Sequence, residues 1–204
     1  LKPNHFGDLV AMNALYRPGP MNYIPTYINR KTKNEEVQYP HELLRGILEP
    51  TYGIMVYQEQ IMQAAQILGG FPLGKADLLR RAMGKDMVTM EKQKALFIEG
   101  AALNGIDKDR SKEIFDTIRE FAKYGFNRSH SAAYSVIAYQ TAYLKAHYPA
   151  EYMAAVLTHN LNDIKKITYY IDECKRQKIP VLGPDINESY QYFTVNQKGE
   201  IRFG

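Results

Sequence analysis

The sequence predicts a mainly α protein, a multi-helix fold that ends in a small C-terminal β-hairpin. Apolar residues recur every three or four positions through most of the first 178 residues, which is the spacing of one helix face. Prolines and glycines divide this pattern into about eight main helices and two short ones. After Pro180 the pattern changes to the alternation typical of strands. We therefore expect one domain over residues 1–178 and the start of a second module over residues 179–204.

The helix boundaries follow from residues that stop or cap helices. Pro18, Gly19 and Pro20 end the first helix, because proline lacks the N–H that a helix interior needs. Gly69 and Gly70 end the fourth. The expected helices are, in order, 6–16, a short one at Pro25, 40–48, 57–68, 74–83, 88–103, one from Asp107 or Asp109 to 122, one from Arg128 or Ser129 to 147, 149 to about 159, and one from Asn162 to 177.

Apolar stripes indicate which faces of the last helices are buried. The helix that ends at 122 has an inner stripe of Ile114, Phe115, Ile118 and Phe121. The stripe of the helix that ends at 177 consists of Ile164, Ile167, Ile171 and Cys174. Beyond it, residues 192–195 and 200–203 alternate around a turn at 196–199, and this pattern predicts the hairpin.

Composition excludes several classes of protein. The net charge of +4 is too small to indicate nucleic-acid binding by itself, so local clusters of cations carry more information. The single cysteine, Cys174, excludes an intramolecular disulfide, fits a reducing compartment and is expected to be buried. No signal peptide and no apolar run of about 18 residues occurs, so we expect a cytoplasmic protein that does not span a membrane.

The segment 123–134 is the most informative stretch of the chain. It places Gly125, Arg128, Ser129 and His130 where a new helix begins. Unpaired N–H groups and the helix dipole make a helix N-terminus a good position for a phosphate. Residues 121–150 contain no Asp or Glu and carry five tyrosines, at 124, 134, 139, 143 and 148. The alternative is an ordinary core helix with Ser129 as its N-cap.

A second basic cluster consists of Arg80, Arg81 and Lys85. Cations near a helix C-terminus complement its dipole, and this explanation suffices for Lys85. It explains the two adjacent arginines less well, because neighbouring side chains on a helix point about 100° apart. Guanidinium groups bind phosphate oxygens bidentately, so the pair also fits a triphosphate.

No metal site is predicted. Asp107 and Asp109 have a D-x-D spacing that could hold magnesium, but they stand where a helix N-cap is expected, and we interpret them as caps. Asp185 is followed by Asn187 where a second carboxylate would be needed. The five histidines and one cysteine show no zinc-ligand spacing, and no phosphate-binding P-loop occurs.

Long motifs carry a family resemblance. The stretches PTYGIMVYQEQIMQAAQILGGFPLGKADLLRRAMGK (50–85) and FAKYGFNRSHSAAYSVIAYQTAYLKAHYPAEYMAA (121–155) closely resemble the alpha subunit of bacterial DNA polymerase III, the C-family replicative polymerase. ALYRPGPM (14–21) and GPDINES (183–189) resemble it too. The resemblance covers essentially the whole chain and implies a fingers domain within a much longer DNA-directed DNA polymerase.

The resemblance implies a role for each cluster. Arg80, Arg81, Ser129 and His130 would converge on the triphosphate of the incoming deoxynucleotide. Lys85, Lys123, Arg128 and Arg17 would face DNA phosphates or the palm domain. Tyr124, Phe126 or Tyr134 could stack on the nascent base pair, although each is at least as well explained as a core residue. Magnesium would be held by the palm, outside residues 1–204, so the isolated chain should not polymerise.

The implied partners are primer-template DNA, deoxynucleoside triphosphates, the rest of the polymerase subunit and other replicase subunits. Two other classes stay open at this point. A non-catalytic single-stranded DNA-binding module would use the same cations and aromatics without selecting triphosphates. A helical docking domain for partner subunits would instead expose large apolar patches.

Overall fold

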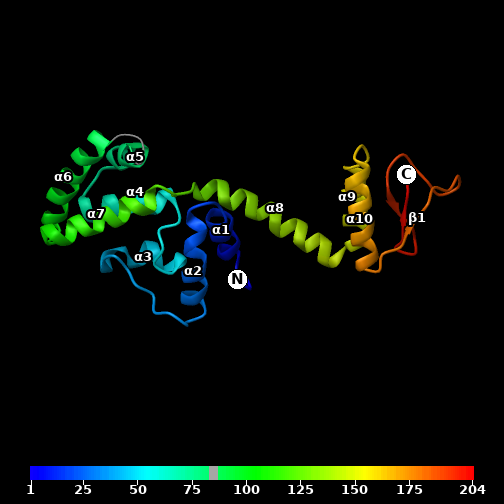
Figure 1. Ribbon diagram of the computed structural model, residues 1–204, viewed down its shortest axis with the longest axis horizontal. Helices are drawn as coiled ribbons and strands as arrows, with labels where there is room; N and C mark the ends of the chain where they lie inside the picture. The colour runs from blue at the N-terminus through cyan, green and yellow to red at the C-terminus, as the bar shows by residue number, and fades with distance from the viewer. Residues whose placement is uncertain (83–86) are drawn as a thin grey trace. The chain divides into compact units, whose positions relative to one another are not determined.

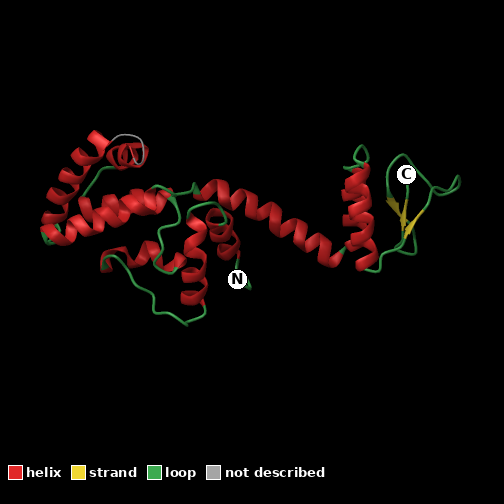
Figure 2. Cartoon of the chain, viewed as in Figure 1, coloured by secondary structure: helices red, strands yellow, loops and turns green. Residues whose placement is uncertain are grey.

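A computed structural model of the protein describes residues 1–82 and 87–204 (Figure 1). As predicted, this part of the chain is mainly helical (Figure 2): it holds ten α-helices, three short 3₁₀-helices and one three-stranded sheet. It divides into two compact units, residues 1–135 and 136–204, and helix α8 contributes to both.

The elements follow the expected order. The first unit contains α1 (Phe6–Leu15), η1 (Pro20–Tyr23), α2 (Ile24–Lys31), η2 (Glu42–Leu44), α3 (Arg45–Leu48), η3 (Glu49–Thr51), α4 (Gln58–Gly69), α5 (Leu73–Ala82), α6 (Met87–Leu103), α7 (Lys108–Ala122) and the first residues of α8 (Arg128–His147). The second contains the rest of α8, α9 (Pro149–Thr158), α10 (Ile164–Arg176), β1 (Val181–Leu182), β2 (Thr194–Val195) and β3 (Ile201–Arg202).

The larger core of the first unit lies among α3 to α7, with Phe97 and Phe115 fully buried and their ring centres 5.3 Å apart. α4 and α6 approach so closely that a Cβ on Gly100 would stand 1.9 Å from the carbonyl oxygen of Gly69. Only a residue without a side chain fits at this crossing. Helix α5, which carries Arg80 and Arg81, packs into the same core through Ala76 and Leu79 (Figure 1).

A second core in this unit joins α1 and α2 to residues 54–57. At its edge the carboxylate of Asp8 is completely buried and pairs with Lys31. It also accepts hydrogen bonds from the N–H of Asn4 at 3.0 Å and from the Tyr27 hydroxyl at 3.3 Å. Burial alone would raise the pKa of Asp8, but the hydrogen bonds from Lys31 and from the N–H of Asn4, with the charges of His5 and Lys31, hold that pKa below its usual value.

The second unit packs α9 and α10 against the small sheet. Its core contains Met153 and Leu157 of α9, Ile167 of α10, and Phe193 and Ile201 from the sheet region. The strand order is β1-β3-β2, with β2 antiparallel to β3 and β1 parallel to it. The predicted hairpin is therefore confirmed, and β1 is an additional strand. The predicted domain boundary near residue 179 stays a prediction.

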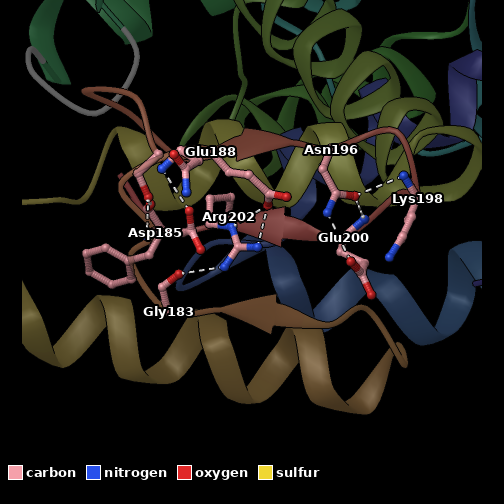
Figure 3. Close-up of polar contacts among 10 residues, drawn as sticks. Gly183, Asp185, Glu188, Asn196, Lys198, Glu200 and Arg202 are labelled. Atoms are coloured by element: carbon pink, nitrogen blue, oxygen red, sulfur yellow. Dashed lines mark hydrogen bonds and ion pairs between the residues drawn. The ribbon is translucent and has the colours of Figure 1, made fainter.

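Side-chain bonds fix the loops of this sheet (Figure 3). The Arg202 guanidinium donates to the carbonyl oxygen of Gly183 at 2.9 Å and to the Glu188 carboxylate at 3.0 Å. In the hairpin turn, Asn196 Oδ1 accepts from the N–H groups of Lys198 and Glu200, both at 3.0 Å. Gly199, between these two residues, has a φ of 78°, which glycine adopts without strain.

Three local predictions need correction. The stretch 40–48 begins as a 3₁₀-helix and becomes α-helical only at Arg45. The cap of α10 is Asp163 rather than Asn162, since Asp163 Oδ1 accepts from the N–H of Lys166 at 3.2 Å. Ile164 is 74% exposed, because it is the first residue of α10 and lies beyond the packed face. The other three stripe positions, Ile167, Ile171 and Cys174, do belong to the core.

Candidate anion-binding site

Helix α8 begins at Arg128, at the residue where the sequence predicts a phosphate-binding helix end. Its cap is Asn127 and not Ser129, because Asn127 Oδ1 accepts from the N–H of His130 at 2.7 Å. Ser129 and His130 are both exposed, so their side chains are accessible at this end of the helix.

The carboxylate of Glu59 already occupies part of this helix end. Both of its oxygens lie 3.1 Å from the N–H nitrogen of Arg128, and Oε1 also accepts from the Asn127 side-chain amide at 3.2 Å. Glu59 belongs to the first turn of α4, almost seventy residues earlier in the chain. An acidic group thus stands where the sequence predicts a phosphate.

The two arginines of α5 share one carboxylate, that of Asp77. Arg80 Nε lies 2.9 Å from Asp77 Oδ1, and Arg81 Nε lies 2.7 Å from Asp77 Oδ2. The hydrogen bond from Arg80, followed by the charges of both arginines, holds the pKa of Asp77 below its usual value. The Arg81 side chain is 69% exposed, whereas that of Arg80 is 29% exposed.

Both halves of the predicted site contact the start of α4. Arg80 Nη1 donates to Gln58 Oε1 at 3.4 Å, and Glu59, the next residue, binds the start of α8. The backbone reinforces this arrangement: the N–H of Gln58 donates to the carbonyl oxygen of Phe126 at 2.9 Å, and the N–H of Phe126 donates to that of Val56 at 3.1 Å. Residues 56–59 therefore link Arg80 to the N-terminus of α8.

Arg17 is tied into the connection between α7 and α8. Its Nη2 donates to the carbonyl oxygen of Tyr124 at 2.6 Å, and its guanidinium lies 4.5 Å from the centre of the Phe126 ring. Burial lowers the pKa of Arg17 from its usual value. Tyr124 packs on Gly19, where a Cβ would stand 2.5 Å from the tyrosine ring. Tyr124 and Phe126 thus take part in packing.

The remaining predicted residues lie around the same helix end. The Arg128 guanidinium lies 5.5 Å from the ring centre of Tyr57. Burial raises the pKa of Tyr57 to about 12, although the positive charge of Arg128 acts to lower it. The His130 ring packs between Phe126 and Tyr134, at 5.5 and 4.7 Å. Lys123 pairs with Glu120. Lys85 lies outside the described residues.

Four polar residues of this arrangement were not singled out from the sequence: Gln58, Glu59, Asp77 and Asn127. Asn127 could have been found, because an asparagine directly before a helix is a common N-cap. Asp77 stands three and four positions before the two arginines, which is the spacing of ion pairs on a helix. Gln58 and Glu59 could not have been found, since their partners are brought to them only by the packing of α4.

The acidic residues considered as metal ligands have structural roles. Asp107 Oδ2 accepts from the N–H groups of Asp109 and Arg110, at 2.8 and 3.2 Å, which confirms it as the N-cap of α7. Asp109 pairs with Lys112, and Asp185 Oδ1 accepts from the N–H of Asn187 at 2.8 Å. Within residues 1–82 and 87–204, no three His, Cys, Asp or Glu side chains form a metal-binding group.

Comparison with known proteins places this chain in a family. Residues 1–105, which include α1 to α6 and both arginines, match the family described as the bacterial DNA polymerase III alpha subunit finger domain. The chain belongs to this family. The resemblance predicted from the sequence is thereby confirmed, and Ser129 and His130 lie beyond the matched residues.

Relatives extend the similarity over the whole chain. The chain is 54% identical over 204 residues to a DNA polymerase III subunit alpha from Borreliella burgdorferi and 50% identical over 212 aligned residues to the one from Escherichia coli K12, with all of the chain covered. The subunit from Neisseria meningitidis serogroup A is 55% identical over 97% of the chain. The chain spans 17 to 18% of the length of these relatives. In the described part of the chain, no helix is long and apolar enough to cross a membrane.

Proposed function

We propose that this chain is the finger region of a bacterial replicative DNA-directed DNA polymerase and binds the triphosphate of the incoming deoxynucleotide. Family membership supports this proposal, since the relatives that share half or more of its residues are DNA polymerase III alpha subunits. In such an enzyme the substrates are deoxynucleoside triphosphates and primer-template DNA, and other replicase subunits are partners of the full-length polypeptide.

One observation carries the assignment of the triphosphate site: Arg80 and the N-terminus of α8 both contact the neighbouring residues Gln58 and Glu59. Each cluster alone has a local explanation, in the Asp77 ion pairs for the arginines and in the Asn127 cap for the helix. Helix stability does not require that α5 and α8 meet at the first turn of α4. A ligand that carries several phosphates does require donors from both α5 and α8 at one place.

The proposed roles follow from the donor chemistry. Arg80 and Arg81 bind phosphate oxygens through their planar guanidinium groups. Ser129 and His130 add a hydroxyl and an imidazole to the positive end of α8. Lys123 and Arg128 raise the local potential for DNA phosphates without selecting bases. Arg17 acts indirectly, because its bonds to Tyr124 and Phe126 hold the segment that leads into α8.

Nucleotidyl transfer by such enzymes uses divalent metal ions, and the described residues of this chain do not fit a site for them. Asp107 accepts two backbone hydrogen bonds, and Asp109 is paired with a lysine. We therefore assign metal binding to the palm, in the part of the full-length polymerase outside residues 1–204. This chain contributes binding and orientation of the triphosphate.

A nucleic-acid strand along α8 is a second candidate function. Tyr139, Tyr143 and His147 form an exposed ladder with ring centres 6.4 and 4.3 Å apart. Exposed aromatic rings can stack with bases of any sequence. Binding of this kind would weaken strongly with salt and would not depend on the triphosphate.

A double-mutant cycle in the full-length polymerase tests the proposal. Arg80→Ala and His130→Ala are made singly and together, and kcat/KM for single-nucleotide incorporation is measured for each. If both residues bind one triphosphate, their effects are expected not to add, because sites that share a ligand are coupled. Additive effects, or losses confined to primer-template affinity, would favour the nucleic-acid strand instead.

A further inference from the structure

Glu59 is an acidic residue within the proposed triphosphate site, where a negative charge is not expected. Its carboxylate is held by three donor contacts, two to the N–H of Arg128 and one to the side chain of Asn127. These donors lie on a different element, at the start of α8, and not on its own helix. The contact is therefore a product of the tertiary fold, unlike the pairing of Asp77 with arginines one turn away.

A carboxylate and a phosphate compete for such a position. The N–H of Arg128 has one hydrogen, which the Glu59 carboxylate already uses, and both anions are stabilised by the positive end of the same helix. Two negative groups at one helix end also repel each other. A triphosphate that binds the first turn of α8 must therefore displace the Glu59 carboxylate or tolerate its charge nearby.

We propose that Glu59 is an internal competitor of the triphosphate, holding the first turn of α8 until a nucleotide takes its place. This inference rests on the proposed function of Arg80, Arg81, Ser129 and His130. Without nucleotide, Glu59 satisfies the start of α8 and joins it to α4. With nucleotide, a phosphate oxygen accepts the Arg128 N–H and the carboxylate turns away. Glu59 thus lowers nucleotide affinity and lets the contact between α4 and α8 change when the nucleotide binds.

The sign of one substitution separates this role from a purely structural one. Glu59→Gln keeps the size of the side chain and one acceptor oxygen but removes the charge. A competitor makes this variant bind nucleotide more tightly. A residue that only positions α8 makes it bind more weakly, because the bonds to Arg128 and Asn127 become weaker.

The experiment uses the full-length polymerase and two probes, a deoxynucleoside triphosphate as substrate and inorganic tripolyphosphate as its inhibitor. For Glu59→Gln we expect the KM for nucleotide and the inhibition constant of tripolyphosphate both to fall by roughly tenfold, the factor that corresponds to 1.4 kcal/mol. The primer-template Kd should stay unchanged. Glu113→Gln is the matched control: it removes an exposed charge on α7, where Glu113 pairs with Arg110, and should change neither constant.

A second measurement keeps the inference testable if the variant is unstable. In the 15N-labelled 204-residue chain, the amide resonance of Arg128 should shift on addition of tripolyphosphate, while that of Lys166, at the start of α10, should not. An unchanged or raised nucleotide KM in Glu59→Gln, or an Arg128 amide that does not respond, would overturn the inference. If Arg81→Ala and His130→Ala also leave tripolyphosphate inhibition unchanged, the proposed function itself fails; if they weaken it, only the role of Glu59 fails.

Discussion

The guanidinium of Arg17 lies 4.5 Å from the centre of the Phe126 ring and donates a 2.6 Å hydrogen bond to the carbonyl oxygen of Tyr124. Residues far apart in the sequence are thus joined where α7 ends and α8 begins. The segment 124–126 carries no regular backbone ladder apart from the single bridge between Tyr57 and Phe126. Arg17 therefore holds the segment that leads into α8, next to the candidate anion-binding site.

Replacing Arg17 should destabilise the fold. Arg17→Met keeps most of the length of the side chain but removes its donors and its charge, leaving the Tyr124 carbonyl oxygen without this partner. The expected loss is about 1 to 3 kcal/mol in the free energy of unfolding, measured by urea denaturation. Arg176→Met is the control, because the exposed Arg176 guanidinium pairs within its own helix with Glu173, which keeps Lys145 as a partner, and should change stability little. Equal losses in the two variants would contradict the role assigned to Arg17.

The crossing of α4 and α6 should not tolerate a methyl group. In Gly100→Ala the new Cβ would stand 1.9 Å from the carbonyl oxygen of Gly69, so the helices must separate. We expect a loss of about 1 to 3 kcal/mol, although alanine normally favours a helix. Gly74→Ala has no atom within 4 Å of its Cβ and should be neutral or stabilising by up to about 1 kcal/mol. Thermal unfolding of the two variants measures the difference.

The buried carboxylate of Asp8 should make the fold sensitive to acid. Because the pKa of Asp8 is lower in the folded protein than in the unfolded chain, its contribution is fully present above the unfolded pKa. It is lost as the pH falls through the folded pKa. Asp8→Asn leaves Lys31 without its buried partner and should cost about 3 to 5 kcal/mol at pH 7.

The acid dependence separates this effect from general destabilisation. Denaturation of Asp8→Asn between about pH 5 and pH 2 should show a weaker loss of stability than the original protein. Glu113→Gln, which removes an exposed carboxylate paired with Arg110, should leave the acid dependence nearly unchanged. Parallel pH curves for Asp8→Asn and the original protein would show that Asp8 is not the linked group.

The sequence predicted elements with local causes and missed contacts made by distant residues. The buried stripe of Ile114, Phe115 and Ile118 and the cap at Asp107 depend on residues that are close together in the sequence, and both are present in the fold. Ile164 has the right spacing but lies on the first position of α10, where no neighbour covers it. Glu59 meets Arg128 only because residues 56–58 bond with Phe126, and no local pattern encodes that contact.

The capping role of Asp107 predicts a structural and not a catalytic defect. Asp107→Ala should lower stability by about 1 kcal/mol through loss of the cap. In the full-length polymerase, the double variant Asp107→Ala, Asp109→Ala should keep its metal dependence and kcat in primer extension. The isolated 204-residue chain should not extend a primer. Extension by the chain that disappears in the double variant would show that these residues hold metal.

Arg81 provides the sharpest test of the triphosphate site, because its side chain is 69% exposed and pairs with Asp77 on its own helix. When Arg81 is removed, Asp77 keeps its ion pair with Arg80, so an effect on catalysis would reflect a lost ligand contact. In the full-length polymerase, Arg81→Ala should lower kcat/KM for nucleotide by about tenfold to a hundredfold, the cost of one charge-assisted bond to phosphate. The Kd for primer-template should change much less.

Arg81→Lys distinguishes charge from geometry at the same position. Lysine restores the positive charge but not the planar pair of donors, so we expect only part of the lost kcat/KM to return. Full recovery would mean that Arg81 contributes potential alone, as proposed for Lys123. Normal nucleotide kinetics combined with weaker DNA binding would indicate that Arg81 contacts DNA and not the triphosphate. Single-nucleotide incorporation and primer-template titration on the same three proteins decide among these outcomes.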